Sequence, residues 1–207
     1  MSKHAPYYQG RRFSYDGALC TLRYYGPLAG KNGEWLGVEW DDPARGKHDG
    51  RYEGQQLFKC LSKSPIAGSF LRPTRKAGAE RTLLEAIRHK YGSGSQSEAA
   101  SEEKWSPGRY ESIEISGKVV EEVGFERIQK QLAALTQLRI VLVDELVING
   151  IAPRDSPGEI VHEYQADLAS QCPNIEDLDV GWNVIEKWAD VARMCQPLRK
   201  LSILKAR

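Results

Sequence analysis

Short runs of β-forming residues, broken by glycine, proline and aspartate, fill the chain between positions 11 and 72. The runs are Ala18–Tyr25, Trp35–Trp40, Arg51–Tyr52 and Leu57–Leu61. Short strands punctuated by turn residues are typical of compact antiparallel sheets. The sequence therefore predicts a small all-β barrel with long loops in the front part of the chain.

A pattern of leucine-like residues at fixed spacing lies near the other end. It reads Ile175-x-x-Leu178-x-Val180-x-x-Asn183-x-Ile185, and Leu198-x-x-Leu201-x-Ile203 repeats its start 23 residues later, with Cys172 and Cys195 in register. Upstream, Leu138-x-x-Val141-x-Val143 begins the same pattern at a longer spacing, which predicts an insertion. The pattern favours an α/β leucine-rich-repeat solenoid. Such repeats bury their apolar faces on their neighbours, so three starts lead us to expect an incomplete solenoid, as in a fragment or a truncated gene model.

Between these regions the apolar spacing changes twice. Leu83, Leu84, Ile87 and Tyr91 recur at helical spacing and predict an amphipathic helix. Glycine, serine, glutamine and glutamate then dominate, as in a flexible linker. Further on, Ile113 and Ile115 indicate a strand, and two apolar series indicate helices: Phe125, Ile128, Leu132 and Leu135, then Ile160, Val161, Tyr164 and Leu168. We expect a domain at 1–78, a helix at 79–91, a linker at 92–108 and repeats at 109–207.

Composition indicates a soluble globular protein, with 41% hydrophobic and 28% charged residues. The first residues do not form a secretory signal, and no apolar run is long enough for a membrane helix. We therefore expect a cytoplasmic protein. Cys20, Cys60, Cys172 and Cys195 have no zinc-like spacing and are expected to be free thiols rather than disulfides.

The net charge of +1 conceals an asymmetry. Residues 1–78 hold 13 Lys/Arg and 7 Asp/Glu, whereas residues 79–207 hold 16 and 21. A small basic unit attracts an acidic partner, and either nucleic acid or an acidic peptide would fit.

Four motifs in the front region carry the functional signal. They are Gly33-Glu34-Trp35-Leu36-Gly37-Val38-Glu39, Gly46-Lys47-His48-Asp49-Gly50, Phe58-Lys59-Cys60 and Gly68-Ser69-Phe70-Leu71-Arg72. Their order and spacing resemble the CAP-Gly domain family. The resemblance implies an SH3-like barrel that binds the C-terminal Glu-Glu-Tyr or Glu-Glu-Phe of tubulins and microtubule tracking proteins.

The tail-binding residues expected from this resemblance are Trp35, Gly46, Lys47, His48, Asp49, Gly50, Phe70 and Arg72. The two glycines would let the loop bend through positive φ and let a peptide approach its backbone. Lys47 and Arg72 would meet acidic groups, and Trp35 and Phe70 would provide apolar walls.

Each assignment has a structural alternative. Asp49 fits a turn acceptor at least as well as a ligand contact. Trp35 and Phe58 could belong to the core, and Lys47 and Arg72 could be solvated surface residues.

Two positions depart from the CAP-Gly pattern. His48 stands where the family commonly has asparagine, and Gly30 stands where it commonly has an aromatic residue. One wall of the pocket is therefore expected to be missing or replaced. His48 could still donate a hydrogen bond.

The combination of regions resembles the tubulin-folding cofactor E family. The residues that carry this resemblance are Gly-Lys-His-Asp-Gly at 46–50, the run Lys118–Phe125 and Cys172-Pro173-Asn174-Ile175. It implies a cytoplasmic, cytoskeleton-associated chaperone that handles α-tubulin during assembly or disassembly of the heterodimer, with cofactors B, C and D as further partners.

Three other functions would need other sequence features. A CAP-Gly adaptor at microtubule ends would carry Ser/Pro-rich basic tracts and coiled coil in place of repeats. A nucleic-acid module would need several exposed cations and stacking aromatics. An enzyme would need a motif such as a phosphate-binding loop, a nucleophile elbow or an H-E-x-x-H pair, and the sequence contains none. We therefore predict no catalysis, no cofactor and no metal.

Overall fold

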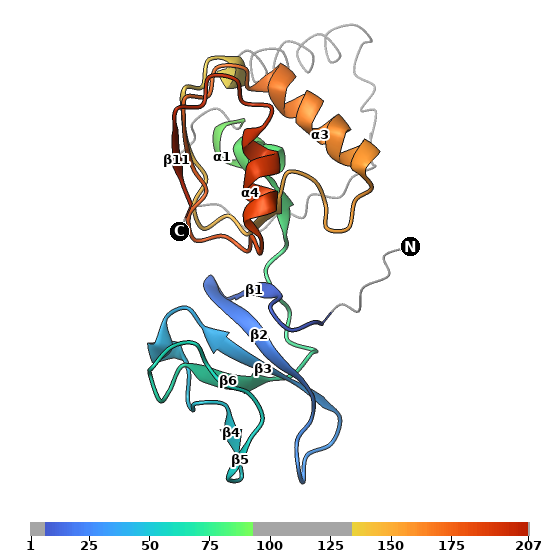
Figure 1. Cartoon of the computed structure of the whole chain (residues 1–207), viewed down its shortest axis with the longest axis vertical. Coiled ribbons are helices and arrows are strands. Elements are labelled where there is room, and N and C mark those ends of the chain that lie inside the picture. The colour runs from blue at the N-terminus through green and yellow to red at the C-terminus, as the bar shows by residue number, and fades with distance from the viewer. Residues whose placement is uncertain (1–6, 93–133, 207) are drawn as a thin grey trace, which may run out of the picture.

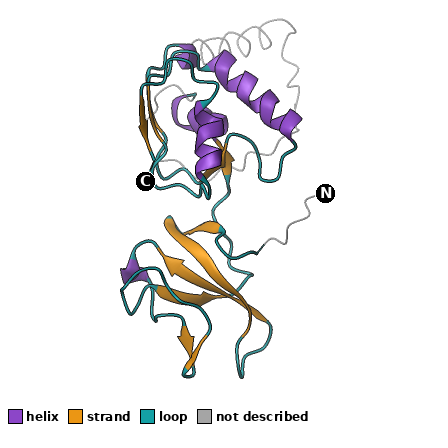
Figure 2. Cartoon of the chain, in the orientation of Figure 1, coloured by secondary structure: helices purple, strands orange, loops and turns teal. Residues whose placement is uncertain are grey.

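The computed structural model describes residues 7–92 and 134–206, which form two units (Figure 1). The N-terminal unit consists of strands, loops and one short 3-10 helix, and the C-terminal unit combines helices with short strands (Figure 2). Together they make a mixed α/β structure.

The N-terminal unit is built on a four-stranded antiparallel sheet in the order β1-β2-β3-β6. Its strands are β1 (Arg12–Tyr15), β2 (Ala18–Pro27), β3 (Glu34–Trp40) and β6 (Gly68–Leu71). Between β3 and β6 the chain forms a short 3-10 helix, η1 (Pro43–Arg45), and a hairpin of β4 (Arg51–Tyr52) with β5 (Gln55–Gln56).

Alternating residues explain the core of this unit. Leu36, Val38 and Trp40 face the same side of β3, because side chains along a strand alternate between its two faces. They are buried with Phe13, Tyr15, Cys20 and Leu22. Trp40 donates its Nε1–H to Ser69 Oγ at 3.0 Å, so its buried polar atom is paired. Trp35 and Gly37 lie on the opposite face of β3, away from this core.

The expectation of a strand at Leu57–Leu61 is wrong. The amides of Leu57 and Phe58 both donate to the Gly50 carbonyl, at 3.1 and 3.4 Å, and the Gln56 side chain donates to the Phe58 carbonyl. These groups are used inside the loop and do not form a strand ladder.

The C-terminal unit contains a three-stranded parallel sheet in the order β11-β10-β8. Its strands are β8 (Ile140–Leu142), β10 (Asp177–Asp179) and β11 (Ile203–Lys205), and its described helices are α1 (Leu83–Tyr91), α3 (Gly158–Gln171) and α4 (Trp188–Cys195). A second parallel pair joins β7 (Arg81–Thr82) to β9 (Ile148–Gly150). Strands followed by helices agree with the α/β character expected from the repeat pattern.

The strand register corrects the predicted phase of the last repeat. Leu178 pairs with Val141 on one side, as the pattern predicts, but with Leu204 on the other, 26 residues further along the chain. The 23-residue spacing aligned Leu178 with Leu201 and Val180 with Ile203. Ile203 instead points outward and is 50% exposed. The sequence around Leu198 offers two leucine frames, and strand pairing selects the later one.

Asn183 ties the turns of the C-terminal unit together. Its Nδ2 donates to the carbonyls of Val143, Val180 and Gly181, and its Oδ1 accepts the amides of Leu146 and Ile148. One buried side chain therefore satisfies backbone groups of two successive loops.

Helix α1 belongs to the core of the C-terminal unit. It begins at Leu83 with a capping box, in which the Thr82 and Glu85 side chains each bond the other residue's backbone amide. Leu83, Leu84 and Ile87 are buried in the same cluster as residues of the parallel strands and of α3 and α4. The predicted helix in this region is therefore present, with four fewer residues at its start.

The predicted helix before Cys172 is also present, as α3. The predicted strand at Ile113 and Ile115, most of the helix through Phe125, Ile128 and Leu132, and nearly all of the linker lie outside the described residues. All four cysteines are free thiols, as predicted. Burial raises the pKa of Cys20 to about 12 and that of Cys172 to about 11, which keeps both protonated.

Candidate peptide-binding site

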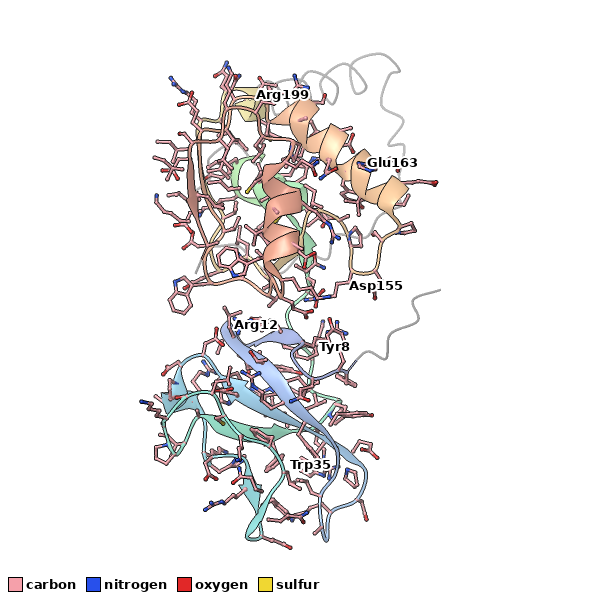
Figure 3. The ribbon with its side chains drawn as sticks, in the orientation of Figure 1. Tyr8, Arg12, Trp35, Asp155, Glu163 and Arg199 are labelled. Carbon is pink, nitrogen blue, oxygen red and sulfur yellow. The ribbon has the colours of Figure 1, made fainter. Side chains whose placement is uncertain are left out.

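The outer face of β3 and β6 brings the expected aromatic and basic residues together. Gly37 pairs with Phe70 and Leu36 with Leu71, so Trp35, Phe70 and Arg72 lie on one face, opposite the core. In Figure 3 Trp35 lies at the part of the N-terminal unit remote from Tyr8 and Arg12.

Phe70 is the centre of an aromatic cluster. The His48 ring stacks on it with a centroid separation of 4.6 Å and an angle of 27°. Tyr24, Tyr52 and Phe58 approach its edge, at 5.6 to 6.4 Å. This cluster, defined by Tyr24, His48, Tyr52, Phe58 and Phe70, forms a half-buried apolar surface.

The loop that carries Lys47 is held against β6 by its backbone. Lys47 and His48 donate their amides to the Gly68 carbonyl, at 2.7 and 3.2 Å, and Gly68 donates back to the His48 carbonyl at 2.6 Å. The Lys47 side chain is exposed and forms no ion pair within residues 7–92 and 134–206. A fixed backbone thus presents a cation to solvent.

Two glycines make this loop possible, for different reasons. Gly50 has a φ of +97°, the left-handed region that glycine favours, and a Cβ there would lie 2.1 Å from the Phe58 carbonyl oxygen. Gly46 has a φ of −84°, so the expectation of a positive φ there is wrong. It is needed because a Cβ would lie 1.9 Å from the Ile66 carbonyl oxygen.

His48 is positioned as a neutral hydrogen-bond donor. Its Nδ1 accepts the Gly50 amide at 3.0 Å, which leaves Nε2 to carry the proton of the neutral ring. Burial lowers the pKa of His48 despite the nearby Asp49 charge. Nε2 is buried and has no hydrogen-bond partner in the described part of the chain.

Asp49 is used within the loop. Its Oδ1 accepts the Arg51 amide at 3.2 Å, and Oδ2 lies 3.7 Å from the Arg51 side chain. These are the contacts of a turn acceptor.

Trp35 and Arg72 form a stacked pair beside the cluster. The Arg72 guanidinium carbon lies 3.7 Å from the Trp35 ring centroid, and Nη1 donates to the Asn32 carbonyl. Arg72 is exposed and Trp35 is half-buried. One face of the indole is therefore covered by a cation that can also meet an acidic group.

The structure adds residues that the sequence did not assign to the site. Gly37 gives the cluster its space, because a Cβ there would lie 2.5 Å from Phe58 Cε1 and 2.8 Å from Tyr24 Cβ. Its place two residues after Trp35 in the Gly33–Glu39 motif was a usable signal, whereas Tyr24 and Tyr52 belong to none of the four motifs. Gly30 has a φ of +65° in a turn, a conformation that disfavours an aromatic residue at this position.

Comparison with known proteins places this geometry in context. The CAP-Gly domain family matches residues 9–76, which contain the whole surface described above. The chain is 35% identical to tubulin-specific chaperone E of Bos taurus over 195 residues, or 94% of this chain. It is 35% identical to the Homo sapiens protein and 30% identical to the Drosophila melanogaster protein over a similar length.

Over nearly its whole length the chain is similar to tubulin-specific chaperone E. It spans about a third of the length of these relatives, 33% in each of the three. This similarity confirms the resemblance to the cofactor E family that the motifs indicated.

Other types of site are less well supported. Residues 7–92 and 134–206 hold no group of three or more His, Cys, Asp or Glu side chains placed to bind a metal ion. No helix in these two ranges has the length and apolar character needed to cross a membrane.

Proposed function

We propose that the CAP-Gly unit binds the acidic C-terminal tail of α-tubulin. The observation that carries this proposal is the exposed Lys47, held on a fixed loop next to the Phe70 cluster and the Trp35–Arg72 pair. Cations beside aromatic surface suit a peptide with glutamates and a terminal aromatic residue. The names of the relatives support tubulin as the source of that peptide.

Roles follow from the contacts. Lys47 and Arg72 would meet carboxylates, and Phe70 and Trp35 would pack against the terminal side chain. Gly46 and Gly50 would shape the loop, and Asp49 would hold its turn. His48 would orient the Phe70 ring.

The fold assignments that go with this function are an SH3-like barrel and the first repeats of a leucine-rich solenoid. The four-stranded sheet with its added hairpin supports the first, and the Asn183 hydrogen bonds with the parallel strands support the second. We further propose the domain limits 1–78 and 109–207, a cytoplasmic role in assembly or disassembly of the tubulin heterodimer, and cooperation with cofactors B, C and D.

Titration calorimetry of the 207-residue chain tests the proposal. An acidic peptide ending in Glu-Glu-Tyr should bind more tightly than the same peptide without the tyrosine. Lys47→Ala should weaken binding about tenfold or more, since a hydrogen bond to a charged group contributes about 1.5–3 kcal/mol. Its fold should be unchanged.

The matched control is Lys76→Ala. Lys76 is an exposed lysine in the segment that follows β6 and reaches β1 through Gly78. Equal affinity for the two peptides would refute recognition of the terminal residue. Unaltered binding by Lys47→Ala would refute the proposed site.

A further inference from the structure

The two units meet through a cluster of charged and polar side chains. In Figure 3 Tyr8 and Arg12 lie on the edge of the N-terminal unit that faces the C-terminal unit. Their counterparts, Arg154 and Glu186, come from loops of the C-terminal unit, more than 140 residues away in sequence.

Glu186 receives donors from both units. Its Oε2 accepts the Tyr8 hydroxyl at 2.6 Å, and its Oε1 accepts the Arg12 amide at 3.1 Å. Oε1 also lies 2.6 Å from Arg154 Nη1 of its own unit. The Glu186 side chain is only 9% exposed, so these contacts replace most of its water.

A second carboxylate extends the cluster. Glu80 lies in the segment between the units and accepts Arg154 Nε at 2.7 Å, Asn149 Nδ2 at 2.9 Å and Arg11 Nη2 at 3.3 Å. Arg154 also donates to the Val184 carbonyl at 3.2 Å. One guanidinium therefore joins two carboxylates and a backbone group.

Arg12 adds a third connection. Its guanidinium is bidentate with Asp41, at 2.6 Å for both pairs, and Nη2 also reaches the Asn183 carbonyl at 3.4 Å. Asn183 is the residue that organises the loops of the C-terminal unit. The edge of the N-terminal sheet is thus bonded to the loop that carries Asn183.

Burial makes this cluster selective for one arrangement. A buried charge that loses a partner is poorly compensated. A rotated N-terminal unit would take the Tyr8 and Arg12 donors away from the buried Glu186. Burial and the Glu186 hydrogen bond raise the pKa of Tyr8 to about 12, so its hydroxyl remains a donor.

We propose that Glu186 fixes the orientation of the N-terminal unit on the C-terminal unit, so that the two move as one body. This inference does not depend on which peptide the CAP-Gly unit binds. The Trp35 surface takes no part in the junction, because Trp35 lies at the part of the N-terminal unit remote from Tyr8 and Arg12 (Figure 3).

Backbone ¹⁵N relaxation of the full chain tests the inference. Amides of β2 and β3 should report the same rotational correlation time as amides of α3 and β10 in the unaltered protein. In Glu186→Gln, which keeps the side-chain shape and removes the charge, the N-terminal unit should have a distinctly shorter correlation time than the C-terminal unit. The peptide affinity measured by calorimetry should be unchanged, which separates this test from that of the proposed function.

Glu163→Gln is the matched control. Glu163 is exposed on α3, away from the junction (Figure 3), and this variant should keep equal correlation times. Unequal times in the unaltered protein, or equal times in Glu186→Gln, would overturn the inference.

A second variant decides the matter if Glu186→Gln loses its native amide dispersion. Tyr8→Phe removes one donor to Glu186 and keeps the ring. It should raise the hydrogen-exchange rate of the Arg12 amide by about tenfold, because that amide shares the same carboxylate. An unchanged rate would overturn the inference.

Discussion

Close contacts at single residues set the shape of the candidate site, and Gly37 is the clearest example. Phe58 and Tyr24 pack where its side chain would be, so any larger residue displaces an aromatic ring of the cluster. The loss of that packing affects both stability and the binding surface.

Gly37→Ala should destabilise the protein by about 1–3 kcal/mol, which is typical of overpacking. Urea unfolding of the full chain measures it. Gly158→Ala is the control, because nothing lies within 4 Å of a Cβ at that position and alanine favours the start of α3. The explanation fails if both variants have the same unfolding midpoint.

Glu39 gives the N-terminal unit a stability that depends on pH. Burial disfavours its charge, but backbone hydrogen bonds from Ser62 and Leu61 and the contact with Arg23 at 2.7 Å lower its pKa below the ordinary 4.5. A lowered folded pKa means that the stabilisation is present above pH 4.5 and disappears as the pH falls through the folded value.

The unfolding free energy should therefore fall more steeply below pH 4.5 in the unaltered protein than in Glu39→Gln. Urea midpoints at a series of pH values measure the two slopes. Glu163→Gln, which alters an exposed carboxylate, should retain the steep slope. Identical slopes in all three proteins would contradict the role of Glu39.

Among the elements, the loops between strands of the C-terminal unit depend on Asn183. Asn183→Ala would leave the amides of Leu146 and Ile148 and the Val143 carbonyl without partners in a buried setting. Each such group costs about 1–3 kcal/mol, so the loss should be among the largest for a single side chain.

Thermal unfolding followed by circular dichroism would show this as a clear fall in the midpoint for Asn183→Ala. Asn32→Ala makes the same truncation at an exposed side chain and should leave the midpoint within error. A comparable fall in both variants would mean that the hydrogen bonds of Asn183 are not the cause.

The sequence predicted helices and strands correctly where its apolar pattern was compatible with one element in one register. Runs of β-forming residues between turn residues located β2 and β3, and helical spacing located α1 and α3. It failed at Leu57–Leu61, where Gln56 and Gly50 take the backbone groups of an otherwise β-like run. It also failed at the last repeat, where Leu198, Leu201 and Leu204 allow two frames and only pairing with β10 distinguishes them.

For the candidate site, the motifs predicted the loop that carries Lys47 and the aromatic residues Trp35 and Phe70. They did not predict which side chains stack on one another. The spacing could not show that Arg72 covers Trp35 or that His48 covers Phe70. Such stacks depend on side-chain conformations across paired strands, for which sequence distance gives no measure.

On the scale of the whole molecule, charge is distributed unevenly, with an excess of six positive charges in residues 1–78. Binding of the acidic peptide should therefore weaken as salt rises, because exposed charges are screened beyond a Debye length of about 8 Å at physiological ionic strength. Calorimetry at increasing sodium chloride measures it. The peptide affinity of Lys47→Ala should change less with salt than that of the unaltered protein. The peptide affinity of Lys76→Ala should match that of the unaltered protein. Affinity that is independent of salt would contradict an electrostatic contribution.

The junction was beyond prediction from sequence. Arg12 and Glu186 are 174 residues apart, and neither belongs to a recognisable motif. The pairing depends on how the two units place their edges together, and sequence distance gives no measure of that.

The buried Glu186 junction has a consequence for any partner that touches both units. A partner held at two points forms a chelate, and its second contact occurs at an effective concentration set by the distance between the points. If the two units moved independently, the distance between the two contact points would be an average over many arrangements. If their relative orientation is fixed, this distance has one value. A partner long enough to reach both points would gain avidity from the second contact, whereas a partner too short to reach would gain none.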